Sequence, residues 1–111
     1  MKRLLVVDDD YSIRSILQEY FNKNGYEAKS VESAKSAIEI LKAEKYDLVI
    51  TDLMMTGMNG IELMEFVKKS DPDIAFLIIT AYGTIKTAVE ALHKGAFDFI
   101  TKPFSLSAIN S

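Results

Sequence analysis

The chain contains 111 residues, 49% of them hydrophobic, which is enough for one compact domain over residues 1–111 with a buried core. Its formal net charge of −3 argues against direct binding of nucleic acid or of an anionic membrane by this chain. There is no cysteine, which excludes disulfide and thiolate chemistry, and the N-terminal apolar run is too short for a signal peptide or a membrane span, so we expect a cytoplasmic location.

Five short apolar runs predict β-strands. Residues 4–7, 48–50 and 76–79 are uninterrupted apolar runs, which is typical of central parallel strands covered on both faces. Residues 27–31 are more polar, and residues 97–101 alternate between apolar and polar side chains. These two segments are therefore predicted to be the edge strands of the same sheet.

Between these runs, apolar residues recur every three or four positions and predict four amphipathic helices. Each stripe is narrow enough to cover only one face of its helix. The stripes are Ile13, Ile16, Leu17 and Tyr20; Ala34, Ala37, Ile38 and Leu41; Ile61, Met64 and Val67; and Ile85, Ala88, Val89 and Leu92.

Residues with specific backbone preferences mark the ends of these helices. Asn59 and Glu62 have the spacing of a capping box, and Ser33 is a predicted N-cap. Gly25 and Gly95 follow helical stretches, where a left-handed residue commonly ends a helix. The chain contains no linker or internal repeat that would interrupt this order of elements.

The alternation of strands and helices predicts an α/β fold of the doubly wound, flavodoxin-like (βα)5 type. We expect a five-stranded parallel sheet in the order 2-1-3-4-5 as the middle layer of a three-layer sandwich. A fifth helix would begin after Pro103 and is truncated at Ser111.

Acidic residues follow two strands that this topology makes neighbours. Ligands of such sheets bind beyond the carboxyl ends of the strands, where Asp8 and Asp9 would face Asp52. Carboxylates this close cannot all stay ionised unaided, and Mg²⁺ is a cation that carboxylates hold. Asp10 is interpreted as the cap of the first helix, which is also the simplest role for an isolated acid at this position.

Thr80 and Lys102 end the fourth and fifth strands at the same edge. No glycine-rich phosphate-binding loop follows any strand, so the pattern does not indicate a nucleotide site. A metal, a carboxylate, a hydroxyl group and an ammonium group are instead the groups needed to move a phosphoryl group onto an aspartate. The carboxylate that would attack is Asp52.

Four segments together resemble the receiver domain of two-component response regulators. They are the acid cluster after the first strand, "TDLMMTGMNG" around Asp52, "IITAYG" around Thr80 and "DFITKPF" around Lys102. The run "AYGTIKTAVEALHKGAFDFITKPF" is most similar to nitrogen-regulation-type transcriptional activators. The resemblance covers nearly the whole chain and implies the flavodoxin-like fold derived above.

The resemblance implies that Asp52 accepts a phosphoryl group from a sensor histidine kinase in a Mg²⁺-dependent reaction. It implies no enzymatic activity beyond phosphorylation of the domain itself and slow autodephosphorylation. The implied metal ligands are Asp8, Asp9, Asp52 and the backbone carbonyl of Met54, and the implied phosphoryl contacts are Thr80 and Lys102.

The resemblance also implies a conformational switch made of Thr80 and Phe99. The switch would change the face formed by the fourth helix and the fifth strand, which could bind a second copy or an output domain. The resemblance implies that this output domain is a transcriptional one. This sequence has Thr56 where the family usually has proline, and Phe99 where the family often has tyrosine. The family also favours a cis peptide bond between Lys102 and Pro103.

Two alternatives remain open at the level of sequence. Asp8, Asp10 and Ser12 superficially match the D-x-D-x-T/V motif of haloacid dehalogenase-type phosphatases, in which Asp8 would be phosphorylated. Alternatively, the domain could be an interaction module that keeps the fold without phosphorylation. Such a module is expected to lack a site residue, whereas every site residue named above is present.

Overall fold

The computed structural model describes residues 2–81 and 85–102. The predicted fifth helix after Pro103 and the peptide bond between Lys102 and Pro103 lie outside the described residues. The elements in chain order are β1 (Arg3–Val7), α1 (Tyr11–Lys23), β2 (Glu27–Val31), α2 (Ala34–Ala43), β3 (Leu48–Asp52), α3 (Gly60–Lys68), β4 (Ala75–Thr80), α4 (Ile85–His93) and β5 (Asp98–Thr101).

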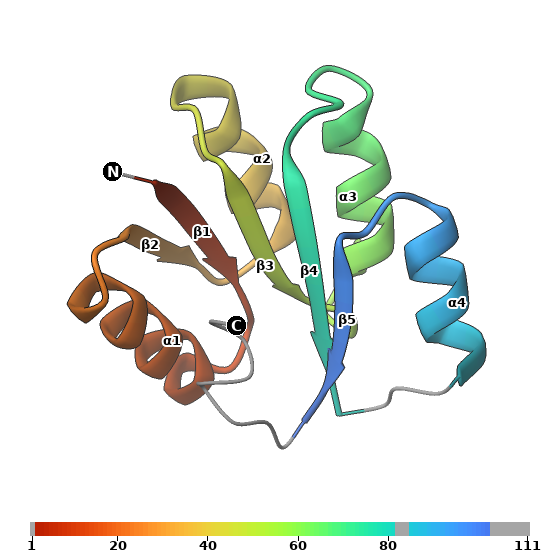
Figure 1. The fold of residues 1–111 in the computed structure, drawn as a ribbon, viewed down its shortest axis with the longest axis horizontal. Coiled ribbons are helices and arrows are strands. Elements are labelled where there is room, and N and C mark those ends of the chain that lie inside the picture. Colours follow the sequence, from red (N-terminus) through yellow and green to blue (C-terminus); the bar gives the residue numbers. More distant parts are fainter. Residues whose placement is uncertain (1, 82–84, 103–111) are drawn as a thin grey trace.

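The five strands form one parallel sheet in the order β2-β1-β3-β4-β5, which confirms the predicted doubly wound topology (Figure 1). Val7 pairs with Thr51 at the end of β1, and Thr80 pairs with Thr101 at the end of β4. This register brings the carboxyl ends of four strands to one edge. The predicted site residues at or just beyond these strand ends are Asp8, Asp52, Thr80 and Lys102.

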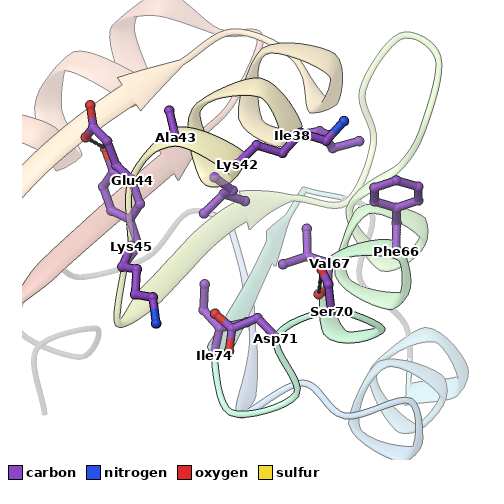
Figure 2. Close-up of a pocket in the computed structure, with 12 residues that line it drawn as sticks. Ile38, Lys42, Ala43, Glu44, Lys45, Phe66, Val67, Ser70, Asp71 and Ile74 are labelled. Carbon is purple, nitrogen blue, oxygen red and sulfur yellow. Dashed lines mark hydrogen bonds between the residues drawn. The ribbon is translucent and has the colours of Figure 1, made fainter.

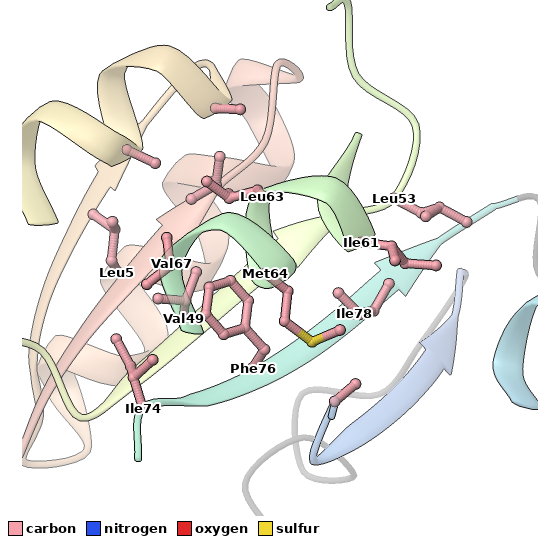
Figure 3. Packing of buried hydrophobic residues seen from close by; sticks show 14 of the residues in the cluster. Leu5, Val49, Leu53, Ile61, Leu63, Met64, Val67, Ile74, Phe76 and Ile78 are labelled. Carbon is pink, nitrogen blue, oxygen red and sulfur yellow. The ribbon is translucent and has the colours of Figure 1, made fainter. Parts of the chain in front are cut away.

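The sheet separates two hydrophobic cores. On one face, α1 buries Leu17 and Phe21 against the sheet. On the other face, α2, α3 and α4 cover a larger core that contains Met64, Phe76 and Ile78 (Figure 3). Each large apolar side chain buried in this way contributes about 1.5–3 kcal/mol to folding, so the cores hold the strand ends in a fixed register.

The helix ends follow the predicted capping signals. Asn59 Oδ1 accepts the N–H of Glu62 at 2.8 Å, and Glu62 Oε1 accepts the N–H of Asn59 at 2.9 Å, which completes the capping box. The hydroxyl oxygen of Ser33 accepts a hydrogen bond at the start of α2. Gly25 and Gly95 have φ angles of 90° and 113°, which glycine adopts without steric cost.

The predicted apolar stripe of α4 is wrong. Its only fully buried residue in the described structure is Ala91, whereas Ile85 is 86% exposed and Val89 and Leu92 are about half exposed. Consecutive residues are about 100° apart around a helix, so turning Ala91 toward the sheet turns Leu92 away. The predicted stripe of α1 is partly wrong in the same way, since Leu17 faces the sheet and the neighbouring Ile16 is exposed.

The predicted bounds of β2 match the observed ones, and those of the other four strands differ by one or two residues. β5 begins at Asp98, and the preceding Phe97 is exposed rather than part of the strand. Over the part of the chain that the structure describes, no helix combines the length and the hydropathy that crossing a lipid bilayer requires.

Candidate functional site

The turn after β1 holds its acids in three different environments. Asp8 is buried, and its Oδ1 accepts a hydrogen bond of 2.8 Å from the N–H of Asp10. Asp10 in turn caps α1, because its Oδ1 accepts from the N–H groups of Ser12 and Ile13. Asp9 lies between them with an exposed side chain. The predicted capping role of Asp10 is therefore confirmed.

Asp52 ends β3 and is almost fully buried. Its Oδ1 lies 3.4 Å from the N–H of Met54, which donates to it, and its carbonyl oxygen accepts the hydroxyl of Thr51 at 3.0 Å. Gly60, the first residue of α3, packs directly on this backbone. A Cβ atom at Gly60 would lie 2.4 Å from the carbonyl oxygen of Asp52, so only glycine fits.

The three acids expected to bind a metal converge at the edge of the sheet. One carboxylate oxygen from each of Asp8, Asp9 and Asp52 lies within 4.8 Å of the other two. Carboxylate oxygens are hard ligands of the kind that Mg²⁺ prefers, so this donor set fits the predicted cation. The contribution of the Met54 carbonyl stays a prediction.

Lys102 lies between the two buried carboxylates. Its Nζ is 3.2 Å from Oδ2 of Asp8 and 3.3 Å from Oδ2 of Asp52. Burial, followed by the charge of Asp8, raises the pKa of the Asp52 carboxyl group, and Lys102 offsets this only in part. Burial alone would lower the pKa of Lys102, but Asp8 and Asp52 outweigh it and the pKa is raised. Lys102 is therefore held as an ammonium group between the two carboxylates.

The two predicted switch residues lie on the neighbouring strands. Thr80 is fully buried at the end of β4, and its carbonyl oxygen accepts a hydrogen bond of 2.8 Å from the N–H of Lys102. Phe99 on β5 is partly buried and packs against the core below α2, α3 and α4. The strand ends thus connect Thr80 to Lys102 directly through the backbone.

Sequence reasoning missed two residues of this site. Arg14 donates from Nη1 to the carbonyl oxygen of Asp8 at 2.8 Å, although its place on the polar face of α1 is typical of a solvent-exposed side chain. Gly60 occupies a helix start, where glycine is common and gives no sign of a close backbone approach. Both contacts are made to backbone atoms only six and eight residues away, and such contacts leave no spacing pattern in the sequence.

A cavity of about 450 Å³ lies elsewhere, between α2 and α3 (Figure 2). Ile38, Phe66 and Ile74 are among the residues that line it. Its walls include the segments that precede β3 and β4, so it opens near the amino ends of the strands. The acids lie at the carboxyl ends, and the cavity is therefore not part of their site.

The sequence matches the family model of the response regulator receiver domain over residues 4–111. It is 38% identical over 108 residues to sporulation initiation phosphotransferase F of Bacillus subtilis (strain 168), with 97% of this chain and 87% of that protein covered. It is 36% identical over 106 residues to the DNA-binding transcriptional regulator NtrC of Rhizobium meliloti (strain 1021). That match covers 96% of this chain but only 22% of the longer protein.

A solved structure is similar over the same range. The solution structure of the beryllofluoride-activated NtrC4 receiver domain dimer has a TM-score of 0.94 and 34% identity, with 99% of this chain and 91% of that chain covered. These similarities confirm the predicted resemblance to receivers of the nitrogen-regulation type. They give no support to the phosphatase alternative, and Asp10 is engaged as a helix cap rather than facing a shared site with Asp8.

Proposed function

Because the chain belongs to the response regulator receiver domain family, we propose that Asp52 accepts a phosphoryl group from a sensor histidine kinase. The observation that carries this assignment is the position of Asp52, whose buried carboxylate lies among Asp8, Asp9 and Lys102 at one sheet edge. In the transfer, the bond from a carboxylate oxygen of Asp52 to phosphorus forms as the bond from phosphorus to the donor's leaving atom breaks.

The residues of the site have distinct proposed roles. Asp8, Asp9, Asp52 and the backbone carbonyl of Met54 would hold Mg²⁺, which when bound neutralises charge on the phosphoryl oxygens. The ammonium group of Lys102 neutralises another part of that charge, and the hydroxyl of Thr80 donates to a phosphoryl oxygen. No separate acid or base is proposed, because the attacking group is the carboxylate of Asp52 itself.

The proposed output is a change of the face formed by α4 and β5. Ile85, Val89 and Leu92 are exposed apolar residues of α4, and Phe97, which directly precedes β5, is exposed as well. We propose that a second copy of the chain binds there after phosphorylation, and the dimer named for the similar NtrC4 receiver structure supports this choice. The partners of the whole protein would be the kinase and an output domain.

The proposed setting is the cytoplasm, where the DNA-binding relatives would meet their targets. We propose that this chain itself binds neither nucleic acid nor a membrane. Its catalysis is limited to its own phosphorylation and to slow hydrolysis of the phosphoryl group, because the site residues named above all serve the aspartate.

Phosphorylation by acetyl phosphate tests this function without a kinase. We expect the wild-type chain to gain one phosphoryl group in Mg²⁺ and none in excess chelator, and Asp52→Asn to abolish the gain. Asp10→Asn is the matched control, because asparagine caps a helix about as well as aspartate. Peptide mapping of the labelled residue separates the alternatives, since a phosphatase mechanism would place the phosphoryl group on Asp8.

A further inference from the structure

The backbone of Asp8 is held on both sides of its Cα atom, through its own N–H and its own carbonyl oxygen. The N–H of Asp8 donates to the carbonyl oxygen of Val31 in β2 at 3.2 Å, which continues the sheet. The carbonyl oxygen of Asp8 lies beyond the end of β1 and accepts the guanidinium group of Arg14 at 2.8 Å. A side chain of α1 therefore holds the turn that carries both acids.

Asp9 depends for its position on the peptide unit that joins it to Asp8. Within residues 2–81 and 85–102, the Asp9 carboxylate forms no hydrogen bond or ion pair, and its side chain is exposed. A peptide unit is planar, so fixing the carbonyl oxygen of Asp8 also fixes the direction in which the chain leaves toward Asp9. By contrast, Asp8 is anchored independently through its own carboxylate, which contacts Asp10 and Lys102.

The guanidinium group of Arg14 is itself held in place. It lies over the ring of Tyr11 at 5.3 Å from the centroid, one turn earlier on α1. The N–H of Arg14 also donates to the carbonyl oxygen of Asp10 at 3.0 Å. The backbone and the side chain of Arg14 therefore both bind carbonyl oxygens of the turn that carries the acids.

We infer that Arg14 is a positioning residue for the Mg²⁺ site, acting on Asp9 through the carbonyl oxygen of Asp8. The inference rests on the proposed function, because it assumes that Asp9 binds the cation. Groups that orient metal ligands typically change metal affinity by about tenfold or more when they are removed. Arg14 would be such a group, although it contacts a backbone atom rather than a carboxylate.

The charge of Arg14 and its positioning role predict opposite changes in Mg²⁺ affinity when Arg14 is replaced. The direction of the measured change therefore tests the inference. Arg14 is a cation near the acids, so removing its charge without any positioning role would strengthen Mg²⁺ binding. Loss of positioning would weaken it. A merely structural role of Arg14 would lower the stability of the metal-free chain without changing the affinity of the folded chain.

The test is a titration of the metal-free chain with Mg²⁺ alone. Binding is measured by isothermal titration calorimetry and by the changes in the amide NMR signals of Asp9 and Asp10. We expect Arg14→Met, which keeps the apolar stem but has no donor, to weaken Mg²⁺ binding about tenfold. Arg14→Lys, which keeps a charged donor, should recover part of the loss. Lys23→Met removes a cation from the exposed end of α1 and should leave the affinity unchanged.

Thermal unfolding without Mg²⁺ shows whether each variant is folded before titration. Unchanged or tighter binding by folded Arg14→Met would overturn the inference while leaving the proposed function intact. Arg14→Lys that binds no better than Arg14→Met would also overturn it. A wild-type chain that binds no Mg²⁺ would overturn the inference and the proposed function together.

Discussion

The ammonium nitrogen of Lys102 lies 3.3 Å from Oδ2 of Asp52, so the end of β5 neutralises the end of β3 across the intervening β4. Both side chains are largely buried, and the same ammonium group also contacts Asp8. Removing one partner of a buried pair leaves an uncompensated charge, which costs more than the pair itself contributes. Losing Lys102 alone is therefore expected to destabilise the metal-free domain.

Lys102→Met should lower the free energy of unfolding by about 3 kcal/mol in Mg²⁺-free buffer, because Asp8 and Asp52 lose their cation. Added Mg²⁺ should recover much of this loss, since a bound cation replaces the missing charge. Urea denaturation with and without Mg²⁺ measures both effects. Lys23→Met, which breaks an exposed pair with Glu19, should cost less than about 1 kcal/mol, and an equal loss in the two variants would contradict the prediction.

Gly60→Ala should impair phosphorylation of Asp52 as well as stability. The new methyl group would meet the carbonyl oxygen of Asp52 at 2.4 Å, and this contact is with backbone that cannot rotate away. We expect a loss of about 1–3 kcal/mol in the free energy of unfolding and a slower reaction with acetyl phosphate.

Gly25→Ala is the control for this effect. Gly25 has a positive φ angle of 90° but open space around it, so alanine there costs about 1–2 kcal/mol through backbone strain alone. It should leave the labelling rate of the folded chain unchanged. If Gly60→Ala labels as fast as Gly25→Ala, the close approach of α3 does not position Asp52.

The sequence predicts the topology well because the central strands are covered on both faces. Continuous apolar runs such as residues 76–79 are typical of a buried strand, and the carboxyl ends of parallel strands share one edge of the sheet. The approach of Asp8 to Asp52 follows from that rule together with the strand order, which places β1 beside β3. The apolar stripe of α4 failed because Ala91 and Leu92 belong to two overlapping stripes, and only packing on the sheet decides between them.

The contacts that sequence reasoning missed involve polar or small residues at unremarkable positions. Arg14 and Gly60 touch backbone atoms of the two acid-bearing turns, and such contacts leave no pattern of spacing or composition. Glu44 is a further example. It contacts Arg3 at the start of β1 and Lys29 in β2, and this cluster forms only when the strands are paired.

Stability should fall in acid through Glu44. Hydrogen bonds from Tyr46, Lys29 and Arg3, in that order, lower the pKa of Glu44 from 4.5 to about 2. Because the folded pKa is below the unfolded one, the contribution of Glu44 is complete above pH 4.5 and is lost as the pH falls toward 2.

Urea denaturation of wild type and Glu44→Gln between pH 7 and pH 2 measures this contribution. The difference in unfolding free energy between the two chains should shrink through the acid range, and high salt should reduce it at neutral pH because the group is partly exposed. A difference that is constant from neutral to acid pH would show that the charge of Glu44 is not what stabilises the cluster.

Thr80→Ala should separate phosphorylation from its distant effect. A phosphoryl group on Asp52 needs ordered donors, and the hydroxyl of Thr80 is proposed to move toward it, which would let Phe99 turn inward. Beryllofluoride with Mg²⁺ mimics the phosphoryl group in solution. In wild type it should shift the amide signals of α4 and β5, well beyond the metal ligands, by biasing two existing conformations.

In Thr80→Ala, beryllofluoride should still bind at Asp52, but most of the shifts in α4 and β5 should be lost. The backbone link from the Thr80 carbonyl oxygen to Lys102 survives the substitution, so the variant isolates the hydroxyl. Thr101→Ala is the matched control, because Thr101 pairs with Thr80 in the sheet but has an exposed side chain. If the shifts in α4 and β5 persist in full in Thr80→Ala, the Thr80 hydroxyl does not link the phosphoryl site to this face. The link would then run through Lys102 and its backbone hydrogen bond to Thr80, which the variant leaves intact.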